Sequence, residues 1–242
     1  MAKKVFIGVG HGGSDPGAVG NGLRESDLNL SISLACYTQL IRHGIDVRMS
    51  RTTDESDTLT EEIRECNEYG PDLAIDIHNN AGGGDGAEAY YYSGGGLSKT
   101  LAENVLREIE RLGQNSRGAK TRMYNGYDYY GFIRETFAPA VIVECAFIDN
   151  AKDIAIVDTE PERVRMGGAI ARGIIKTLGI EYIPGDTDGD GRISLSDASA
   201  MLKHIAGWNG AQIDEIEADL NGDGYVTLSD VSALMKRIAG WK

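Results

Sequence analysis

The chain has 242 residues, of which 41% are hydrophobic and 25% are charged, as is usual for a globular protein of one or two domains. Its net charge of −13 argues against nucleic acid as a partner and is compatible with binding of cations. No apolar run approaches the ~20 residues of a membrane-spanning helix, so we expect no membrane span. The start of the chain also has no signal-peptide pattern, so we expect synthesis without a leader or a leader that has been trimmed.

Apolar segments with strand and helix periodicity alternate along the first 180 residues. We predict strands at 4–9, 45–50, 73–77, 87–92 and 140–147, and helices at 26–43, 58–69, 101–112 and 161–178. This alternation predicts an α/β fold with a mostly parallel, twisted sheet and helices on both faces. Residues 1–180 are expected to form one domain, followed by a linker at 181–185 and a small α-helical domain at 186–242.

The small domain is a tandem repeat. A segment of 24 residues that begins at Asp186 recurs 33 residues later at Asp219, with 14 identical positions. Each copy opens with a loop that matches the calcium-binding pattern, in which oxygens at positions 1, 3, 5, 7 and 12 surround the ion. The predicted ligands are Asp186, Asp188, Asp190, Arg192 and Asp197 in the first loop and Asp219, Asn221, Asp223, Tyr225 and Asp230 in the second.

The helix that follows each loop carries apolar residues at helical spacing. We expect these residues to pack the two helices against each other around a near two-fold axis. They are Ala198, Met201, Leu202 and Ile205 in the first repeat and Val231, Leu234, Met235 and Ile238 in the second.

A histidine within a glycine-rich segment is the most distinctive feature of the first domain. His11 lies in GVGHGGSDPGA, residues 8–18, where the glycines leave its side chain open to a metal ion or substrate. Glu25 and His78 could join it, because polar sites gather at the carboxyl ends of parallel strands. Two histidines and one carboxylate are typical of a catalytic zinc site. Taken singly, His78 could instead cap its strand, and Glu25 could complement the dipole of its helix.

Glu144 interrupts the most apolar strand of the domain, VIVECAF. An unpaired carboxylate is costly to bury, and enzymes use such sites to raise the pKa of a carboxyl group for proton transfer. The alternative is a buried structural salt bridge. We therefore consider Glu144 a candidate general base.

In the order of its motifs, residues 1–179 resemble the zinc-dependent N-acetylmuramoyl-L-alanine amidases of bacterial autolysins, sporulation hydrolases and phage endolysins. The motifs are GHGGSDPGAVGNGLRESDLNL, SRTTD, DLAIDIHNNA, GAEAYYY, SRGAKT and PAVIVECAFIDN. The resemblance implies that His11, Glu25 and His78 bind one zinc ion and that Glu144 is the catalytic residue. It implies hydrolysis of the amide between N-acetylmuramic acid and L-alanine. Val9 departs from the family, in which an aspartate often stands two residues before the first histidine.

Candidate substrate contacts rest on chemistry alone. Arg134 could pair with a peptide carboxylate, although a surface ion pair is an equal alternative, and Asn79 adjoins the second histidine. The aromatic segment YNGYDYYGF, residues 124–132, could flank the substrate groove.

The repeats are similar to a type I dockerin, with two loop–helix units and an acidic residue at position 12. The resemblance implies two structural calcium ions and a cohesin partner on a scaffold protein. Recognition in the family often involves loop positions 10 and 11, here Leu195-Ser196 and Leu228-Ser229, whose near identity would allow two binding orientations. Wall targeting or self-association through the repeats is the alternative.

These observations favour a peptidoglycan amidase with a calcium-dependent docking module. One alternative is a zinc peptidase that cleaves within the stem peptide, and another is a protein that chiefly binds a scaffold or the wall. We expect action on the cell wall, either outside the cell or after release in the manner of a phage endolysin.

Overall fold

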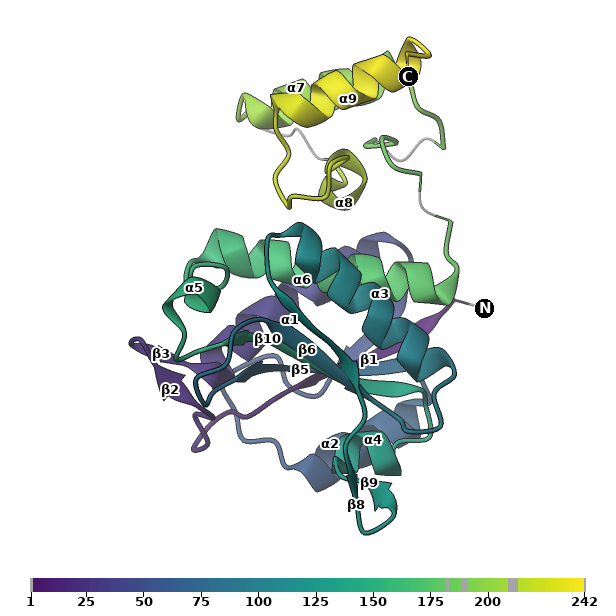
Figure 1. Cartoon of the computed structure of the whole chain (residues 1–242). Coiled ribbons are helices and arrows are strands. Elements are labelled where there is room, and N and C mark those ends of the chain that lie inside the picture. The colour runs from purple at the N-terminus through teal and green to yellow at the C-terminus, as the bar shows by residue number, and fades with distance from the viewer. Residues whose placement is uncertain (1, 182, 189–190, 209–212, 242) are drawn as a thin grey trace. The chain divides into compact units, whose positions relative to one another are not determined.

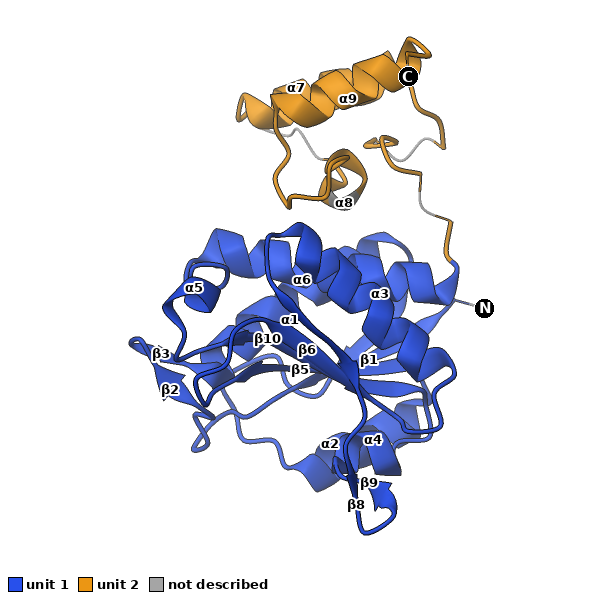
Figure 2. Cartoon of the chain, viewed as in Figure 1, with its two compact units in different colours: residues 1–179 blue, residues 180–242 orange. Residues whose placement is uncertain are grey.

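The computed structural model describes residues 2–181, 183–188, 191–208 and 213–241. The chain divides into two compact units, residues 1–179 and 180–242 (Figure 2). Within the described residues, none of the helices has both the length and the apolar character needed to cross a membrane. Each unit is described separately below.

Unit 1 is built on a six-stranded sheet with the order β4-β1-β5-β10-β6-β7. Its strands are β1 (Lys4–Val9), β4 (Asp46–Met49), β5 (Leu73–Asn80), β6 (Ala87–Tyr91), β7 (Ser116–Lys120) and β10 (Ala140–Phe147). The first four strands of this order run parallel to one another. Strand β6 runs antiparallel to β10, and β7 runs parallel to β6. The prediction of a mostly parallel sheet is therefore confirmed.

Helices cover the two faces of this sheet unequally (Figure 1). One face is covered by the long helices α1 (Glu25–Arg42), α3 (Leu97–Arg111) and α6 (Glu160–Leu178). The other face carries only α2 (Leu59–Tyr69) and α4 (Gly131–Glu135). The remaining elements are the short helix α5 (Ala151–Ile154) and two small hairpins, β2 (Val19–Gly20) with β3 (Leu23–Arg24) and β8 (Met123–Tyr124) with β9 (Tyr127–Asp128).

The sparsely covered face has an apolar half and a polar half. Phe6, Ala74 and Ile142 lie on it and pack with residues of α2 and α4 in one buried cluster. Because side chains alternate along a strand, His78 and Glu144 lie on the same face, farther toward the carboxyl ends of β5 and β10. The apolar half therefore holds the fold together, and the polar half remains for chemistry.

Unit 2 contains α7 (Leu195–Ile205), α8 (Glu215–Ala218) and α9 (Leu228–Ile238). Its core contains Ala198, Met201, Ile213, Ala218, Val231 and Leu234, so the predicted packing of the two repeat helices is partly correct. It is wrong for Leu202, Ile205 and Met235, which are exposed. The buried stripe of each helix is narrower than the run of apolar residues, because residues 201 and 202 point about 100° apart around an α-helix.

The segment assigned to a linker makes contacts within unit 2. The N–H of Ile183 donates to the Glu217 carboxylate over 3.2 Å, and the N–H of Gly185 donates to the Glu217 carbonyl over 2.8 Å. Arg237 also donates to the carbonyl of Pro184. Residues 183–185 are therefore part of the second unit.

Thr58 begins α2 with a capping box, because its hydroxyl accepts from the N–H of Glu61 and its own N–H donates to the Glu61 carboxylate. Thr58→Ala is expected to lower the free energy of unfolding of unit 1 by about 1 kcal/mol. Urea unfolding followed by far-ultraviolet circular dichroism measures the change. Tryptophan fluorescence reports unit 2 separately, because both tryptophans, Trp208 and Trp241, lie there. Thr58→Ser retains the hydroxyl and should unfold like the wild type; equal losses in both variants would exclude capping as the cause.

Candidate active site

His11 follows β1 in a loop whose backbone is partly in the left-handed region. Its own φ is +62°, in the left-handed region. The Nδ1 atom lies 2.8 Å from the carboxylate of Asp15, which can only accept, so this nitrogen carries a proton and donates it. The Nε2 atom faces Glu25 at 3.3 Å. The loop thus presents Nε2 toward Glu25 and fixes the ring through Asp15.

Glu25 is the first residue of α1, and its side chain is buried among donors. Its carboxylate accepts from the N–H of Ala18 at 2.9 Å and from the N–H of Asn79 at 3.2 Å. Burial alone would raise the pKa of Glu25, but hydrogen bonds from His11 and His78 outweigh it and hold this pKa well below its usual range. Glu25 is therefore ionised at neutral pH.

His78 lies near the end of β5 between two carboxylates. Its Nδ1 atom is 3.0 Å from Glu25, and its Nε2 atom is 3.1 Å from Asp76. Burial opposes protonation of this ring, but the charges and hydrogen bonds of Asp76 and Glu25 prevail and raise the pKa of His78 well above its usual value. Asp76 therefore holds the ring from behind, as Asp15 holds His11.

His11, Glu25 and His78 together fit a metal ion. One nitrogen or carboxylate oxygen from each of the three lies within 4.8 Å of the others. In each imidazole one nitrogen faces Glu25, and the other forms a hydrogen bond with an aspartate. Such hydrogen bonds orient histidine ligands in metal sites. Two imidazoles and one carboxylate are ligand types that suit zinc. A metal ion would displace the protons that these rings carry, so its affinity rises with pH.

Glycines clear the space in which these side chains meet. A Cβ on Gly10 would lie 2.2 Å from the His78 ring. A Cβ on Gly17, whose φ is +63°, would lie 2.6 Å from both the Glu25 carboxylate and the His11 ring. The glycine-rich segment is thus required by the packing of the three ligands as well as by access to them.

Glu144 lies on β10 beside this cluster. The strand register places Glu144 opposite His78 on one side and opposite Glu88 on the other. Burial, together with the negative charges of Glu25 and other carboxylates, raises the pKa of Glu144 to about 7, although His78 opposes the shift. Its Oε2 atom is buried and has no hydrogen-bond partner within the described residues. A carboxyl group of this kind is suited to exchange protons near neutral pH.

The predicted substrate contacts occupy different settings. Asn79 is buried, and its side chain donates to Asn29 at 2.9 Å while its backbone N–H holds Glu25. Arg134 donates to the carbonyls of Asp128 and Tyr129 at 2.8 and 3.1 Å and also pairs with Glu135. Asn79 therefore lies beside Glu25 but is buried. The Arg134 guanidinium is hydrogen-bonded to the segment that precedes α4.

Several residues that support the site were not singled out from the sequence. Arg51 is buried and donates to the carbonyls of Val9, Gly10 and Ser26. These hydrogen bonds connect the start of the His11 loop to α1. Asp15 gave a weak signal, as an acidic residue four positions after His11. Arg51 gave none, because only the folded chain shows its carbonyl partners.

In unit 2 the first repeat gathers carboxylates in the expected way. Oxygens of Asp186, Asp188 and Asp197 lie within 4.8 Å of one another. Asp197 has two roles, since one oxygen accepts from the N–H of Thr187 and the other from the N–H of Ser194, the N-cap of α7. Arg192 lies at the position that would offer its carbonyl. The predicted ligand Asp190 lies outside the described residues.

The second repeat has the same construction. Asp230 accepts from the N–H of Leu220 at 3.0 Å and from the N–H of Thr227, the N-cap of α9, at 3.0 Å. Asp219 accepts from the backbone of Gly222, Asp223 and Gly224. The other predicted ligands, Asn221 and Tyr225, lie in this loop, where Asn221 donates to Asp223 at 3.0 Å. Among the described residues of unit 2, only those of the first loop bring three carboxylates within 4.8 Å of one another, so the second calcium site stays a prediction from the repeated loop pattern.

Gly10→Ala should weaken binding of metal ions to unit 1, because the added methyl group overlaps the His78 ring. A loss of affinity of about tenfold or more is expected, as for other changes that misplace a metal ligand. Metal content after dialysis against limiting zinc measures it. Gly168→Ala is the matched control, since a Cβ there meets open space. Unchanged metal content in Gly10→Ala would contradict the role of this position.

Comparison with known proteins agrees with this geometry. The family described as N-acetylmuramoyl-L-alanine amidase matches residues 5–176, and the family described as dockerin type I domain matches residues 184–239. The chain is 38% identical over 154 residues to N-acetylmuramoyl-L-alanine amidase CwlM of Bacillus licheniformis, which covers 62% of this chain and 58% of that protein. It is 31% identical over 190 residues to the endolysin of Bacillus phage SPP1, and the match covers 75% of this chain and 68% of the endolysin.

Solved structures give the same result. Cwp6 from Clostridium difficile superimposes with a TM-score of 0.72 at 40% identity, covering 74% of this chain and 30% of that one. A second match is the catalytic domain of CwlV, an N-acetylmuramoyl-L-alanine amidase from Bacillus (Paenibacillus) polymyxa var. colistinus. Its TM-score is 0.67 at 29% identity, and the match covers 74% of this chain and 99% of that domain. The metal-ligand cluster and Glu144 therefore lie within a region that carries the family's fold, and the chain belongs to the N-acetylmuramoyl-L-alanine amidase family, with a type I dockerin domain after it.

Proposed function

We propose that this protein hydrolyses the amide bond between N-acetylmuramic acid and the L-alanine of the peptidoglycan stem peptide. The observation that carries this proposal is the convergence of His11, Glu25 and His78 beside Glu144, in a chain of the amidase family. Because the chain spans only 58% of the length of CwlM, the activity and the substrate remain our proposal.

The three ligands would hold one zinc ion, which would supply the Lewis acid that activates water and polarises the amide carbonyl. Asp15 and Asp76 keep the two imidazoles oriented. Backbone donors stabilise the negative charge of Glu25 inside the fold, so once the metal ion replaced the ring protons the ligand set would carry one negative charge and two neutral rings.

Glu144 is the group that moves protons in this proposal. As a carboxylate it accepts a proton from the attacking water, and as a carboxylic acid it returns that proton to the nitrogen of the departing L-alanine. Its setting supports both states, because burial raises its pKa to about 7. Its buried Oε2 atom accepts no hydrogen bond from the described part of the chain, which leaves its lone pairs uncommitted for this exchange.

Glu144→Gln should lower the rate by about 10²- to 10⁴-fold while zinc binding persists, since glutamine keeps the shape but cannot exchange the proton. Mass spectrometry of digested cell walls gives the rate and the bond: free lactyl carboxyl groups and new L-alanine amino termini support the amidase.

In the wild type, the rate should fall as the pH drops through the pKa of Glu144, because protonation removes the base. A bound cation lowers that pKa, so this fall lies at or below pH 7.

New termini within the stem peptide would instead identify a zinc peptidase. Full activity in Glu144→Gln would exclude the proposed base, and a wild type that releases neither product would leave binding as the main role.

We further propose that unit 2 binds two calcium ions and docks to a cohesin on a scaffold protein. The repeated side chains support a surface of two equivalent halves: Leu195 and Leu228 are 61% and 64% exposed at the same loop position. Trp208 and Trp241 are also exposed and equivalent. We place the site of action at the cell wall, where peptidoglycan lies.

Binding of a cohesin panel should require calcium and should survive substitution in either half alone. Leu195→Asp and Leu228→Asp are each expected to retain binding, because the other repeat offers the second orientation. The double variant should lose it. Native gel shifts with and without a calcium chelator measure this, with tryptophan fluorescence as a check of folding. Loss of binding in one single variant would exclude two orientations, and calcium-independent or absent binding would favour wall targeting or self-association.

A further inference from the structure

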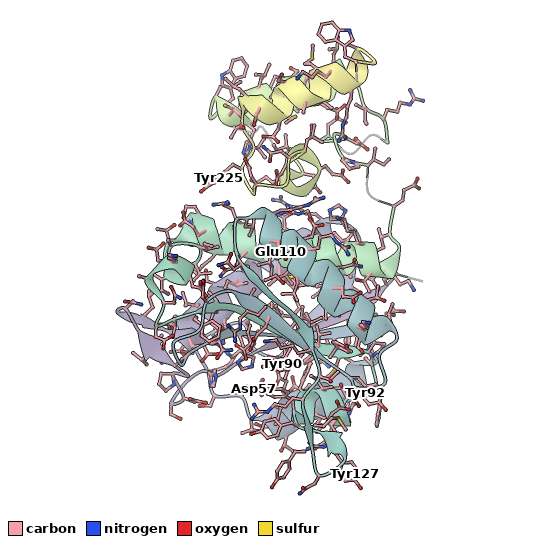
Figure 3. All side chains as sticks on the ribbon, viewed as in Figure 1. Asp57, Tyr90, Tyr92, Glu110, Tyr127 and Tyr225 are labelled. Carbon is pink, nitrogen blue, oxygen red and sulfur yellow. The ribbon has the colours of Figure 1, made fainter. Side chains whose placement is uncertain are left out.

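The β8–β9 hairpin displays a group of exposed aromatic rings. Tyr124, Tyr127 and Tyr129 are 66%, 69% and 46% exposed, and we call them the tyrosine platform. Figure 3 shows Tyr127 on the hairpin, beyond α2 and α4, and Tyr90 under the sheet. The platform borders an open hollow of about 550 Å³, lined by Tyr124, Asn125, Tyr127, Asp128, Tyr129 and Arg134. Exposed apolar surface of this kind usually marks a binding site.

The platform is held in place by contacts below it. The Asp128 carboxylate accepts from the N–H and the hydroxyl of Ser93 at 3.0 and 2.9 Å. Arg134 donates to two carbonyls of the segment. The Tyr124 and Tyr129 rings meet edge to face at 6.4 Å, and the Arg122 guanidinium lies 4.0 Å from the centre of the Tyr129 ring. The rings are therefore pre-organised, which reduces the entropy lost when a ligand binds.

A continuous series of contacts joins the platform to Glu144. The Tyr129 ring meets the Tyr130 ring at 5.1 Å, and Tyr130 meets Tyr90 at 4.8 Å. The Tyr90 hydroxyl donates to Glu88 at 2.8 Å, and Glu88 lies opposite Glu144 in the strand register. The platform is thus connected through Tyr130, Tyr90 and Glu88 to the face of the sheet that carries Glu144.

The charges around the platform favour a neutral ligand. The Arg134 guanidinium is bonded to carbonyls and paired with Glu135. The Arg122 guanidinium is stacked on Tyr129 and donates to the Tyr130 hydroxyl. Both cations are thus engaged, whereas a stem peptide carries carboxylates that need free ones. Flat rings with a hydroxyl at one edge suit pyranose sugars, which offer an apolar face and polar edges.

We propose that the tyrosine platform binds sugar rings of the glycan strand beside the muramyl residue that is cleaved. This proposal rests on the function proposed above. It predicts that the enzyme prefers long glycan strands over single muramyl peptides, because only a longer strand reaches the platform.

The test compares Tyr124→Ala/Tyr127→Ala with wild type in the full chain. The double variant should bind a soluble tetramer of N-acetylglucosamine about tenfold more weakly by calorimetry. Its KM for glycan strands that carry stem peptides should rise by about the same factor, whereas its kcat and its KM for N-acetylmuramoyl-L-alanyl-D-isoglutamine should not change. Tyr124→Phe/Tyr127→Phe keeps both rings and is the matched control; it should bind the tetramer more tightly than the double alanine variant, because the stacking surface is retained.

Equal changes on the long and the short substrate would overturn the proposal, as would a wild type that shows no saturable binding of the tetramer. Weaker binding of a free stem peptide in the double variant, with the tetramer unaffected, would identify a peptide site instead. If the wild type cleaves neither substrate, the amidase assignment fails, and the tetramer titration still decides the role of the platform.

Discussion

The buried carboxylate of Glu25 is the charge around which unit 1 is organised. A carboxylate removed from water is costly unless donors compensate it, and here two backbone N–H groups and two imidazoles do so. Those donors come from the His11 loop and from β5, which the sheet brings together. The two imidazoles of this group also lie where they could bind a cation together with Glu25, in exchange for their protons. Folding of the loop and formation of the site are therefore one process.

The second constraint comes from the sheet, because one of its faces carries both an apolar cluster and the polar side chains of the candidate site. The long helices α1, α3 and α6 cover one face, while α2 and α4 leave part of the other open (Figure 1). Phe6 and Ala74 fill the covered half, and His78 and Glu144 occupy the same face of neighbouring strands nearer their carboxyl ends. A shift of one residue in the register of β10 would turn Glu144 to the opposite face, so the catalytic geometry depends on correct strand pairing.

Much of this could be predicted from the sequence, and the rest could not for identifiable reasons. Strand and helix periodicity predicted the sheet. The glycine context pointed to His11, the end of an apolar strand pointed to His78, and a carboxylate within the most apolar strand pointed to Glu144. The reversed direction of β6 has no local signal, because periodicity reports burial and not strand direction. Nor did the sequence reveal that Arg51 pins the His11 loop or that Leu202 and Met235 stay exposed, since both depend on partners distant in the chain.

The pairing of β1, β5 and β10 also determines when the site can exist. His11 comes from the start of unit 1 and Glu144 from near its end, and the two meet only through β5 between them. A nascent chain that has emerged as far as His78 holds every metal ligand but lacks the strand that carries the base. Because β10 is the last strand of the sheet in chain order, Glu144 joins the cluster of His11, Glu25 and His78 only after this strand has been synthesised and inserted.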